Sequence, residues 1–203
     1  MVAQPTPRVT PQEYLKLERD AKFKSEYFRG YILNMAGASP QHDIISGNVF
    51  SSLHVQLRGK PCTPYTSNMR MGVRTAEMYF YPDAAVVCGE PTFDDEWSDT
   101  ILNTTVIFEV LSKSTERFDR GEKSAAYRAL PSLKELVLIS QHQPTAERYT
   151  RQPDNTWLFT EVASIDGTLE LPSIDCRIPM ADIYERIDFP PPTPPEIDPR
   201  IPR

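Results

Sequence analysis

The stretch Thr105-Val106-Ile107-Phe108-Glu109-Val110-Leu111 decides the fold, and it holds one acidic side chain inside an apolar run. A short, continuous apolar run is typical of a strand in the interior of a sheet. Residues two apart in a strand share a face, so Glu109 shares its face with Ile107 and Leu111. A carboxylate buried there is costly unless its charge is compensated. We therefore expect Glu109 either to bind a cation or to pair with an Arg or Lys from a helix.

A second acid stands at the start of another strand-like run, Tyr81-Pro82-Asp83-Ala84-Ala85-Val86-Val87-Cys88. If this strand pairs beside the first, the carboxylates of Asp83 and Glu109 converge. Two neighbouring carboxylates repel each other unless one is protonated or a cation bridges them. Such a pair is suited to holding a divalent metal against a phosphate.

Helix and strand signals alternate along the chain. Thr10-Pro11-Gln12-Glu13 is a capping box that predicts a helix to about residue 20, with Val9 and Tyr14 as its hydrophobic staple. Further helices are predicted at 40–57, 119–130 and 180–187. Strands are predicted at 26–35 (a pair turning near Arg29-Gly30), 63–74, 79–88, 105–111, 136–139, 147–149, 157–162 and 168–171. This order predicts one α/β domain with a central sheet and flanking helices.

Length and composition indicate one globular domain with tails. The chain has 203 residues, of which 39% are hydrophobic. We expect an N-terminal arm at 1–9, a domain at 10–188, and a flexible tail at 189–203, which carries seven prolines. No apolar run reaches membrane-spanning length, and the N-terminus lacks the apolar segment of a signal peptide.

Charge and cysteine content narrow the class of protein. The net charge of −6 argues mildly against indiscriminate DNA binding. The three cysteines, Cys62, Cys88 and Cys176, are odd in number and show no metal spacing. We expect them to be small buried side chains of a protein in the reducing cytoplasm. The acidic segment 94–99 is predicted to be a solvated loop.

The ordered set of motifs resembles the Uma2 family (DUF820), which is abundant in cyanobacteria and lies within the PD-(D/E)xK nuclease superfamily. The resemblance covers roughly residues 10–187. The matching pieces are Glu26-Tyr27-Phe28-Arg29-Gly30, His42 with Ile45, Pro82 to Val87, Phe108 to Thr115, then Asp119, Lys123 and Tyr127, and finally Leu136 to Ile139. Each piece alone is weak, but their order is specific.

The resemblance implies a restriction-endonuclease-like core, in which a central mixed β-sheet is flanked by helices. It implies an Mg²⁺-dependent endodeoxyribonuclease that hydrolyses DNA phosphodiesters, with Mn²⁺ as a substitute metal. Asp83, Glu109 and the carbonyl of Val110 would hold the metal. Asp83, Glu109 and a lysine would be the catalytic residues.

The position of that lysine departs from the superfamily pattern, because Leu111 stands two residues after Glu109 where the pattern has Lys. Lys113 would share the face of Glu109 if the strand continues. Lys123 follows Asp119 on a helix and precedes Tyr127 at the same four-residue spacing. The resembled family carries an Asp and a Lys on this helix, which favours Lys123. The structural alternatives are a capping box formed by Asp119 with Glu122, and a salt bridge between Lys123 and Asp119.

Several further residues are candidates for accessory roles. Glu26 could complete the metal shell or orient Lys123. His42, in the first turn of its helix, could contact phosphate or act as a base, or simply cap the helix. His54 and His142 are predicted to be surface residues. Five arginines would contact phosphates if they gather at the mouth of the site: Arg70, Arg74, Arg117, Arg120 and Arg128.

Two functions of other classes remain open. Leu111 and the acidic net charge also fit a degenerate nuclease fold that binds nucleic acid or protein without cleaving it. Tyr149, Trp157 and Phe159 could belong to the interface of a homo-oligomeric scaffold rather than to the core. A homodimer is expected in either case.

Overall fold

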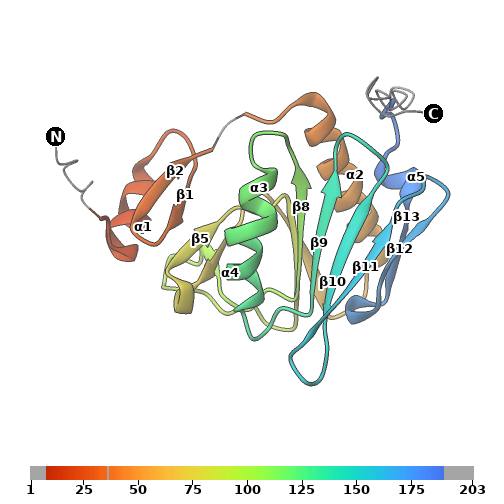
Figure 1. Cartoon of the computed structure of the whole chain (residues 1–203). Coiled ribbons are helices and arrows are strands. Elements are labelled where there is room, and N and C mark those ends of the chain that lie inside the picture. Colours follow the sequence, from red (N-terminus) through yellow and green to blue (C-terminus); the bar gives the residue numbers. More distant parts are fainter. Residues whose placement is uncertain (1–7, 36, 190–203) are drawn as a thin grey trace, which may run out of the picture.

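The N-terminal helix and hairpin form as predicted. The hydroxyl of Thr10 accepts a hydrogen bond from the Glu13 N–H at the start of α1 (Pro11–Asp20), and the Glu13 carboxylate accepts one from the Thr10 N–H. β1 (Ser25–Phe28) pairs antiparallel with β2 (Tyr31–Asn34) around Arg29 and Gly30, both of which have positive φ. The computed structural model describes residues 8–35 and 37–189 and places this unit at one end of the molecule (Figure 1). The predicted Pro-rich stretch and residues 1–7 of the arm lie outside the described residues.

The central sheet is mixed, as predicted. Its six strands lie in the order β11-β10-β9-β8-β6-β3, and only β8 and β9 run parallel. Its strands are β3 (Cys62–Thr66), β6 (Ala84–Cys88), β8 (Val106–Leu111), β9 (Glu135–Ser140), β10 (Ala146–Arg151) and β11 (Trp157–Val162). Since β6 and β8 are neighbours, the strand that follows Asp83 does pair beside the strand that carries Glu109.

Helices cover both faces of this sheet (Figure 1). α2 (Pro40–Gln56) buries Ile45, Val49 and Leu53 against Val106, Phe108 and Val110 on one face of β8. The opposite face of β8 packs against the helical segment α3 (Glu116–Phe118), η2 (Asp119–Lys123) and α4 (Ser124–Arg128). Glu109 lies on this second face with Ile107 and Leu111, as the alternation of the strand predicted.

A second sheet joins the hairpin to the core. Its strands show that two of the predicted strands are each divided. Its order is β2-β1-β5-β4-β7, with β4 (Arg70–Val73), β5 (Met78–Phe80) and β7 (Thr100–Ile101). The predicted strand 63–74 is wrong, because the chain turns at 67–69 and its halves, β3 and β4, enter different sheets. The predicted strand 79–88 likewise divides at Pro82 into β5 and β6, because proline disfavours a continued ladder. The short helix η1 (Arg74–Ala76) links β4 to β5.

The C-terminal part adds a small hairpin to the α2 side of the core. β12 (Thr168–Leu171) pairs with β13 (Cys176–Pro179) through the short helix η3 (Pro172–Ile174). The terminal helix α5 (Met180–Ile183) is shorter than the predicted 180–187. Among the described helices, none is long and apolar enough to cross a bilayer.

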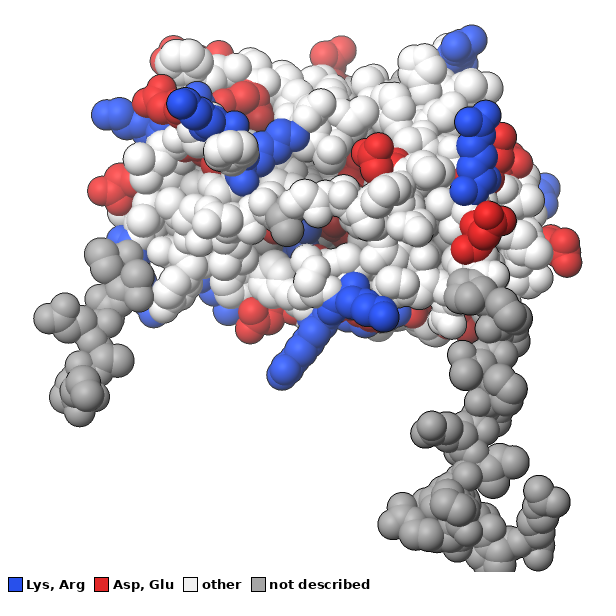
Figure 2. Space-filling model, turned by 90° about the horizontal axis from the view of Figure 1, so that it is seen from above, with Lys and Arg blue, Asp and Glu red and all other residues white. Residues whose placement is uncertain are grey.

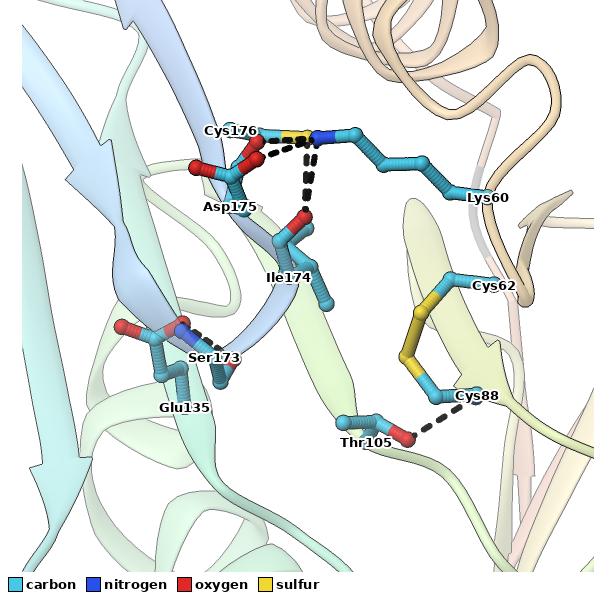
Figure 3. Close-up of a disulfide and its surroundings, with 9 residues drawn as sticks. All are labelled: Lys60, Cys62, Cys88, Thr105, Glu135, Ser173, Ile174, Asp175 and Cys176. Atoms are coloured by element: carbon cyan, nitrogen blue, oxygen red, sulfur yellow. Dashed lines mark hydrogen bonds and ion pairs between the residues drawn. A yellow bond between two sulfur atoms is a disulfide. The ribbon is translucent and has the colours of Figure 1, made fainter.

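Two of the three cysteines are joined, contrary to the expectation of separate buried side chains. Cys62 and Cys88 face each other across the β3–β6 ladder and form a disulfide (Figure 3). The sequence separation of 26 residues hid this pairing, which depends on the antiparallel register of the two strands. Cys176 is buried and free, and lies near the contact of Lys60 with Asp175 (Figure 3). The disulfide lies at the opposite end of β6 from Asp83.

Candidate functional site

The neighbouring strands β6 and β8 bring Asp83 and Glu109 together. Asp83 directly precedes β6, and its neighbour Ala84 is the register partner of Phe108. The backbone N–H of Val110 donates a hydrogen bond of 2.7 Å to Oδ2 of Asp83. The residue after Glu109 therefore fixes the Asp83 carboxylate at the same end of the sheet.

A buried lysine connects Glu109 to two further acids. Nζ of Lys123 lies 3.0 Å from Oε1 of Glu26 and 3.0 Å from Oε1 of Glu109. Oδ1 of Asp119 lies 3.7 Å from the same nitrogen. We call these four residues the acid–lysine cluster, and none of them is more than 8% exposed. The hydroxyl of Tyr127 donates a hydrogen bond of 2.6 Å to Oε1 of Glu109. The structure thus joins three segments of the predicted site at one point: β1, β8 and the helical segment that carries Asp119, Lys123 and Tyr127.

A wide helical turn positions Lys123. Between α3 and α4, the backbone N–H of Ser124 donates to the carbonyl of Asp119, five residues earlier, which defines the π-helical segment η2. Such single wide turns occur frequently at functional sites. Asp119 makes no capping contact at the start of this segment, so the interpretation of Asp119 and Glu122 as a capping box is wrong. The helix begins three residues earlier, at Glu116, and Asp119 points its carboxylate to Lys123 instead.

Burial and the excess of acids shift the pKa values in the cluster. Burial raises the pKa of Glu109 well above its ordinary value; Lys123 opposes this, and the charges of Asp83 and the other acids add to it. Burial alone would lower the pKa of Lys123, but Glu109, Glu26 and Asp119 outweigh it and raise that pKa. Burial and the nearby Glu109 raise the pKa of Tyr127 well above its usual value. The lysine is therefore held as an ammonium, and the tyrosine as a neutral donor.

His42 lies beside Asp83 rather than serving as a cap. Its backbone N–H donates to the hydroxyl of Ser39, the residue that caps α2. Its ring atom Nε2 lies 3.3 Å from Oδ2 of Asp83. Burial lowers the pKa of His42, but the hydrogen bond to Asp83 and the Val110 carbonyl raise it overall. The Asp83 carboxylate is thus held between a strand N–H and an imidazole.

The cluster lies at the floor of a cavity of about 730 Å³. Figure 2 shows a hollow near the middle of the upper face, with acidic and basic atoms at its floor. Lys113 is exposed in the turn after β8 and lines the cavity, because the strand ends at Leu111 and does not carry Lys113 on the face of Glu109. His142 is exposed and also lines the cavity, whereas His54 stacks on Phe50 along α2.

The arginines expected at the mouth of the site do not gather there, since no arginine lies among the described cavity-lining residues. Arg70 is buried and reaches Asp99 at 2.9 Å. Arg19, at the end of α1, holds Asp95 and Asp99 at 2.7 Å each. The predicted acidic loop at 94–99 is solvated at Glu96 to Ser98, but folding brings α1 and β4 against Asp95 and Asp99, whose carboxylates are held in ion pairs. Of the other candidates, Arg74 pairs with Asp94, Arg120 with Glu116 and Glu147, and Arg128 lies over the ring of Tyr149.

The donor set fits a hard divalent cation. Asp83 and Glu109 each use one carboxylate oxygen in the contacts above, Oδ2 and Oε1, and each has a second oxygen to offer. No group of three or more acidic, His or Cys side chains forms a metal cluster within 8–35 and 37–189. Mg²⁺ needs only one or two carboxylates, since water and substrate phosphates complete its shell. The surplus of acids over lysine in the cluster would also be relieved by a cation.

Two contributions to the site were absent from the sequence interpretation. The backbone N–H of Tyr81 donates to Oε1 of Glu26 over 3.2 Å, which anchors that carboxylate between two sheets. Phe118 lines the cavity, with its ring packed edge-on against Phe28 and Phe80. Neither had a local signal, because both depend on the approach of segments distant in sequence.

A family model, two relatives and a solved structure each match most of this chain. The Synechocystis protein sll1609 is 36% identical over 170 residues, which are 84% of this chain and 96% of that protein. The Synechocystis protein slr1290 is 32% identical over 185 residues, 91% and 96% of the two chains. The crystal structure of a putative nuclease belonging to DUF820 from Anabaena variabilis has the same fold, with a TM-score of 0.70 at 16% identity, covering 88% of this chain and 99% of that one. Residues 11–181 match Uma2, described as "Putative restriction endonuclease". The chain therefore belongs to the Uma2 family.

Proposed function

We propose that this protein is an Mg²⁺-dependent endonuclease that hydrolyses phosphodiester bonds of DNA. The observation that carries the proposal is the acid–lysine cluster beside Asp83 at the floor of an open cavity. The family description and the DUF820 structure, a putative nuclease, support the same class of activity. In this proposal, Lys123 takes the role of the lysine that the superfamily pattern has at the position of Leu111.

Asp83, Glu109 and the Val110 carbonyl are the residues that would hold the metal. Bound there, Mg²⁺ would polarise the phosphate and lower the pKa of a water molecule. The chain's own contribution is one of orientation and charge. Lys123 is held as an ammonium, so it cannot accept a proton; it donates hydrogen bonds to the attacking water or to the phosphoryl oxygens that gain charge. Glu26 and Tyr127 fix the positions of Lys123 and Glu109.

The test is Mn²⁺ binding by titration calorimetry, followed by cleavage of labelled DNA. Asp83→Asn and Glu109→Gln keep the shape of each side chain, and each is expected to weaken Mn²⁺ binding by roughly tenfold or more. Asp99→Asn, which makes the same change in charge at a residue that does not line the cavity, is the matched control and should bind as the native protein does. Native-like binding by both site variants would refute the metal site, and with it the proposal.

One observation favours the alternative of a binding module that does not cleave. Asp83 and Glu109 already receive hydrogen bonds from Val110 and Tyr127, so the site is held together by the chain alone. A degenerate nuclease fold would keep this arrangement for stability. Nucleic acid bound equally well with and without Mn²⁺, and recovered uncut, would favour this alternative.

The expected homodimer is retained as a proposal. β11 lies at an edge of the central sheet, and Leu158 and Phe159 on it are about half exposed. Unpaired edges with apolar side chains are common sites of association. Sedimentation equilibrium measures the mass directly; a monomer over the micromolar range would contradict the proposal.

A further inference from the structure

The depth of the cluster limits how a nucleic acid can reach it. Glu109, Asp119 and Lys123 are each about 5% exposed, at the floor of a cavity whose 730 Å³ is typical of a small-ligand pocket. A duplex carries its phosphates on the outside of a wide, stiff helix. The width of a duplex keeps its phosphates away from a floor this deep, whereas an unpaired strand is narrow enough to enter the cavity.

The acidic lining of the cavity does not favour the binding of a nucleic-acid duplex. Acids outnumber lysines among the lining residues: Glu26, Asp43, Asp83, Glu109 and Asp119 against Lys113 and Lys123. Most of the surface around the hollow belongs to residues that are neither acidic nor basic (Figure 2). Duplex binding is dominated by Lys and Arg on several phosphates at once. Among the described residues, many arginines are instead committed to internal ion pairs, as Arg19, Arg70 and Arg120 are.

The lining groups suit the parts of a nucleotide that a duplex hides. Hydroxyls of Ser112, Ser114 and Thr115 lie in the turn after β8, and the amides of Asn34 and Gln141 line the cavity with them. These groups can hydrogen-bond to unpaired base edges. Phe118 is partly buried and lines the cavity, and stacking of bases on aromatic side chains supports single-strand binding.

From these observations we propose that the substrate enters the cavity as an unpaired strand, so that single-stranded or locally melted nucleic acid is preferred over intact duplex. This rests on the proposed nuclease function and specifies its substrate. A single strand of which one or two phosphates are contacted needs few basic side chains, and the described lining residues include two, Lys113 and Lys123. Its binding should therefore depend only weakly on salt.

Cleavage tests the preference directly. Three labelled oligonucleotides of one sequence are compared in Mn²⁺: a single strand, a full duplex, and a duplex with a central unpaired bubble. The single strand and the bubble should be cut about tenfold faster than the duplex or more, with cuts inside the bubble. Equal or faster cleavage of the full duplex overturns the inference while leaving the nuclease proposal intact.

Binding decides the question if nothing is cut, in which case the nuclease proposal fails separately. The native protein is titrated with the same oligonucleotides in Ca²⁺. Tighter binding of the single strand supports the inference, whereas equal or tighter binding of the duplex, or no binding of either, overturns it.

A pair of phenylalanine variants tests the stacking face. Phe118→Leu should weaken single-strand binding about fivefold or more. Phe23→Leu removes a ring that is 85% exposed and lies outside the cavity, and should leave binding unchanged. Thermal unfolding of both variants reports whether the fold is intact. Unchanged binding by a folded Phe118→Leu protein counts against an unpaired base in this cavity.

Discussion

Two ion networks of this molecule differ in their balance of charge. The acid–lysine cluster sets three carboxylates against Lys123, with Asp83 close by. The second network, which we call the arginine cluster, sets Arg19 and Arg70 against Asp95 and Asp99. The first opens to the cavity, whereas none of the four residues of the second lines it. One network has surplus negative charge facing the cavity, and the other is neutral.

The comparison separates structural from functional ion pairs. A balanced network stabilises the contact between α1, β4 and the acidic loop and needs nothing more. Burying surplus acids lowers stability unless a further cation arrives, and such unfavourable arrangements gather at functional sites. The unbalanced cluster is therefore the better candidate for binding a metal, although both clusters consist of similar residues.

The largest effect is expected when each cluster loses its buried cation. Lys123→Met leaves three acids without a counter-charge and should lower the free energy of unfolding by about 3–5 kcal/mol. Arg70→Met, the matched variant, should cost about 1–3 kcal/mol, because Asp99 retains Arg19 and solvent. Urea unfolding measures both.

Added Mn²⁺ tests whether the two clusters differ in metal binding. Millimolar Mn²⁺ should restore part of the stability lost in Lys123→Met, because the acids of that cluster can share the ion. It should do nothing for Arg70→Met. The same response in both variants would mean that the two clusters do not differ in metal binding.

A smaller effect is expected from one hydroxyl in each region. Tyr127→Phe removes the hydroxyl that donates to Glu109 and should lower the free energy of unfolding by about 1.5–3 kcal/mol. It should also weaken Mn²⁺ binding, because Glu109 is then less firmly positioned. Tyr79 donates to Asp94 in the acidic loop. Tyr79→Phe should lower the free energy of unfolding and leave the Mn²⁺ affinity unchanged. If Tyr127→Phe binds Mn²⁺ as tightly as the native protein, Tyr127 does not position Glu109 for a metal.

The smallest effect is the acid sensitivity of the arginine cluster. The hydrogen bond from Arg19, with a further contribution from Arg70, lowers the pKa of Asp99 from 3.8 to about 2. A lowered carboxyl pKa stabilises the fold above the unfolded value, and this stabilisation is lost as the pH falls from about 4 through 2.

Because Asp99 is partly exposed, we expect the loss to be on the order of 1 kcal/mol after screening, or about 2–4 °C in Tm. The Tm difference between the native protein and Asp99→Asn should shrink by that amount between pH 5 and pH 2. A constant difference would show that the ion pair does not stabilise the fold.

The parts of the site that sequence could predict are those with a local cause. Strand alternation placed Glu109 on the face of Ile107 and Leu111, and the capping box placed α1. The meeting of Asp83 with Glu109 followed from the expectation that their strands are neighbours.

What sequence could not predict depends on contacts between distant segments. The turn at 67–69 and the break at Pro82 send consecutive strands into different sheets, which a run of strand-forming residues does not reveal. The pairing of Arg70 with Asp99 and the Cys62–Cys88 disulfide both need the tertiary fold. From sequence, Arg70 is a candidate for a phosphate contact if it reaches the mouth of the site, whereas in the folded chain it holds a loop.

The wide turn of η2 determines which side chains of this helical segment face the cavity. Phe118 and Asp119 lie at or before this turn, whereas Lys123 ends it and Tyr127 follows it. If this turn became an ordinary α-helical turn with the sequence unchanged, every residue after it would be rotated by about 100°, the advance of one residue. The residues on the two sides of the turn would then no longer face the cavity together. Substitutions at the exposed positions of this segment should be tolerated as long as they leave the wide turn in place.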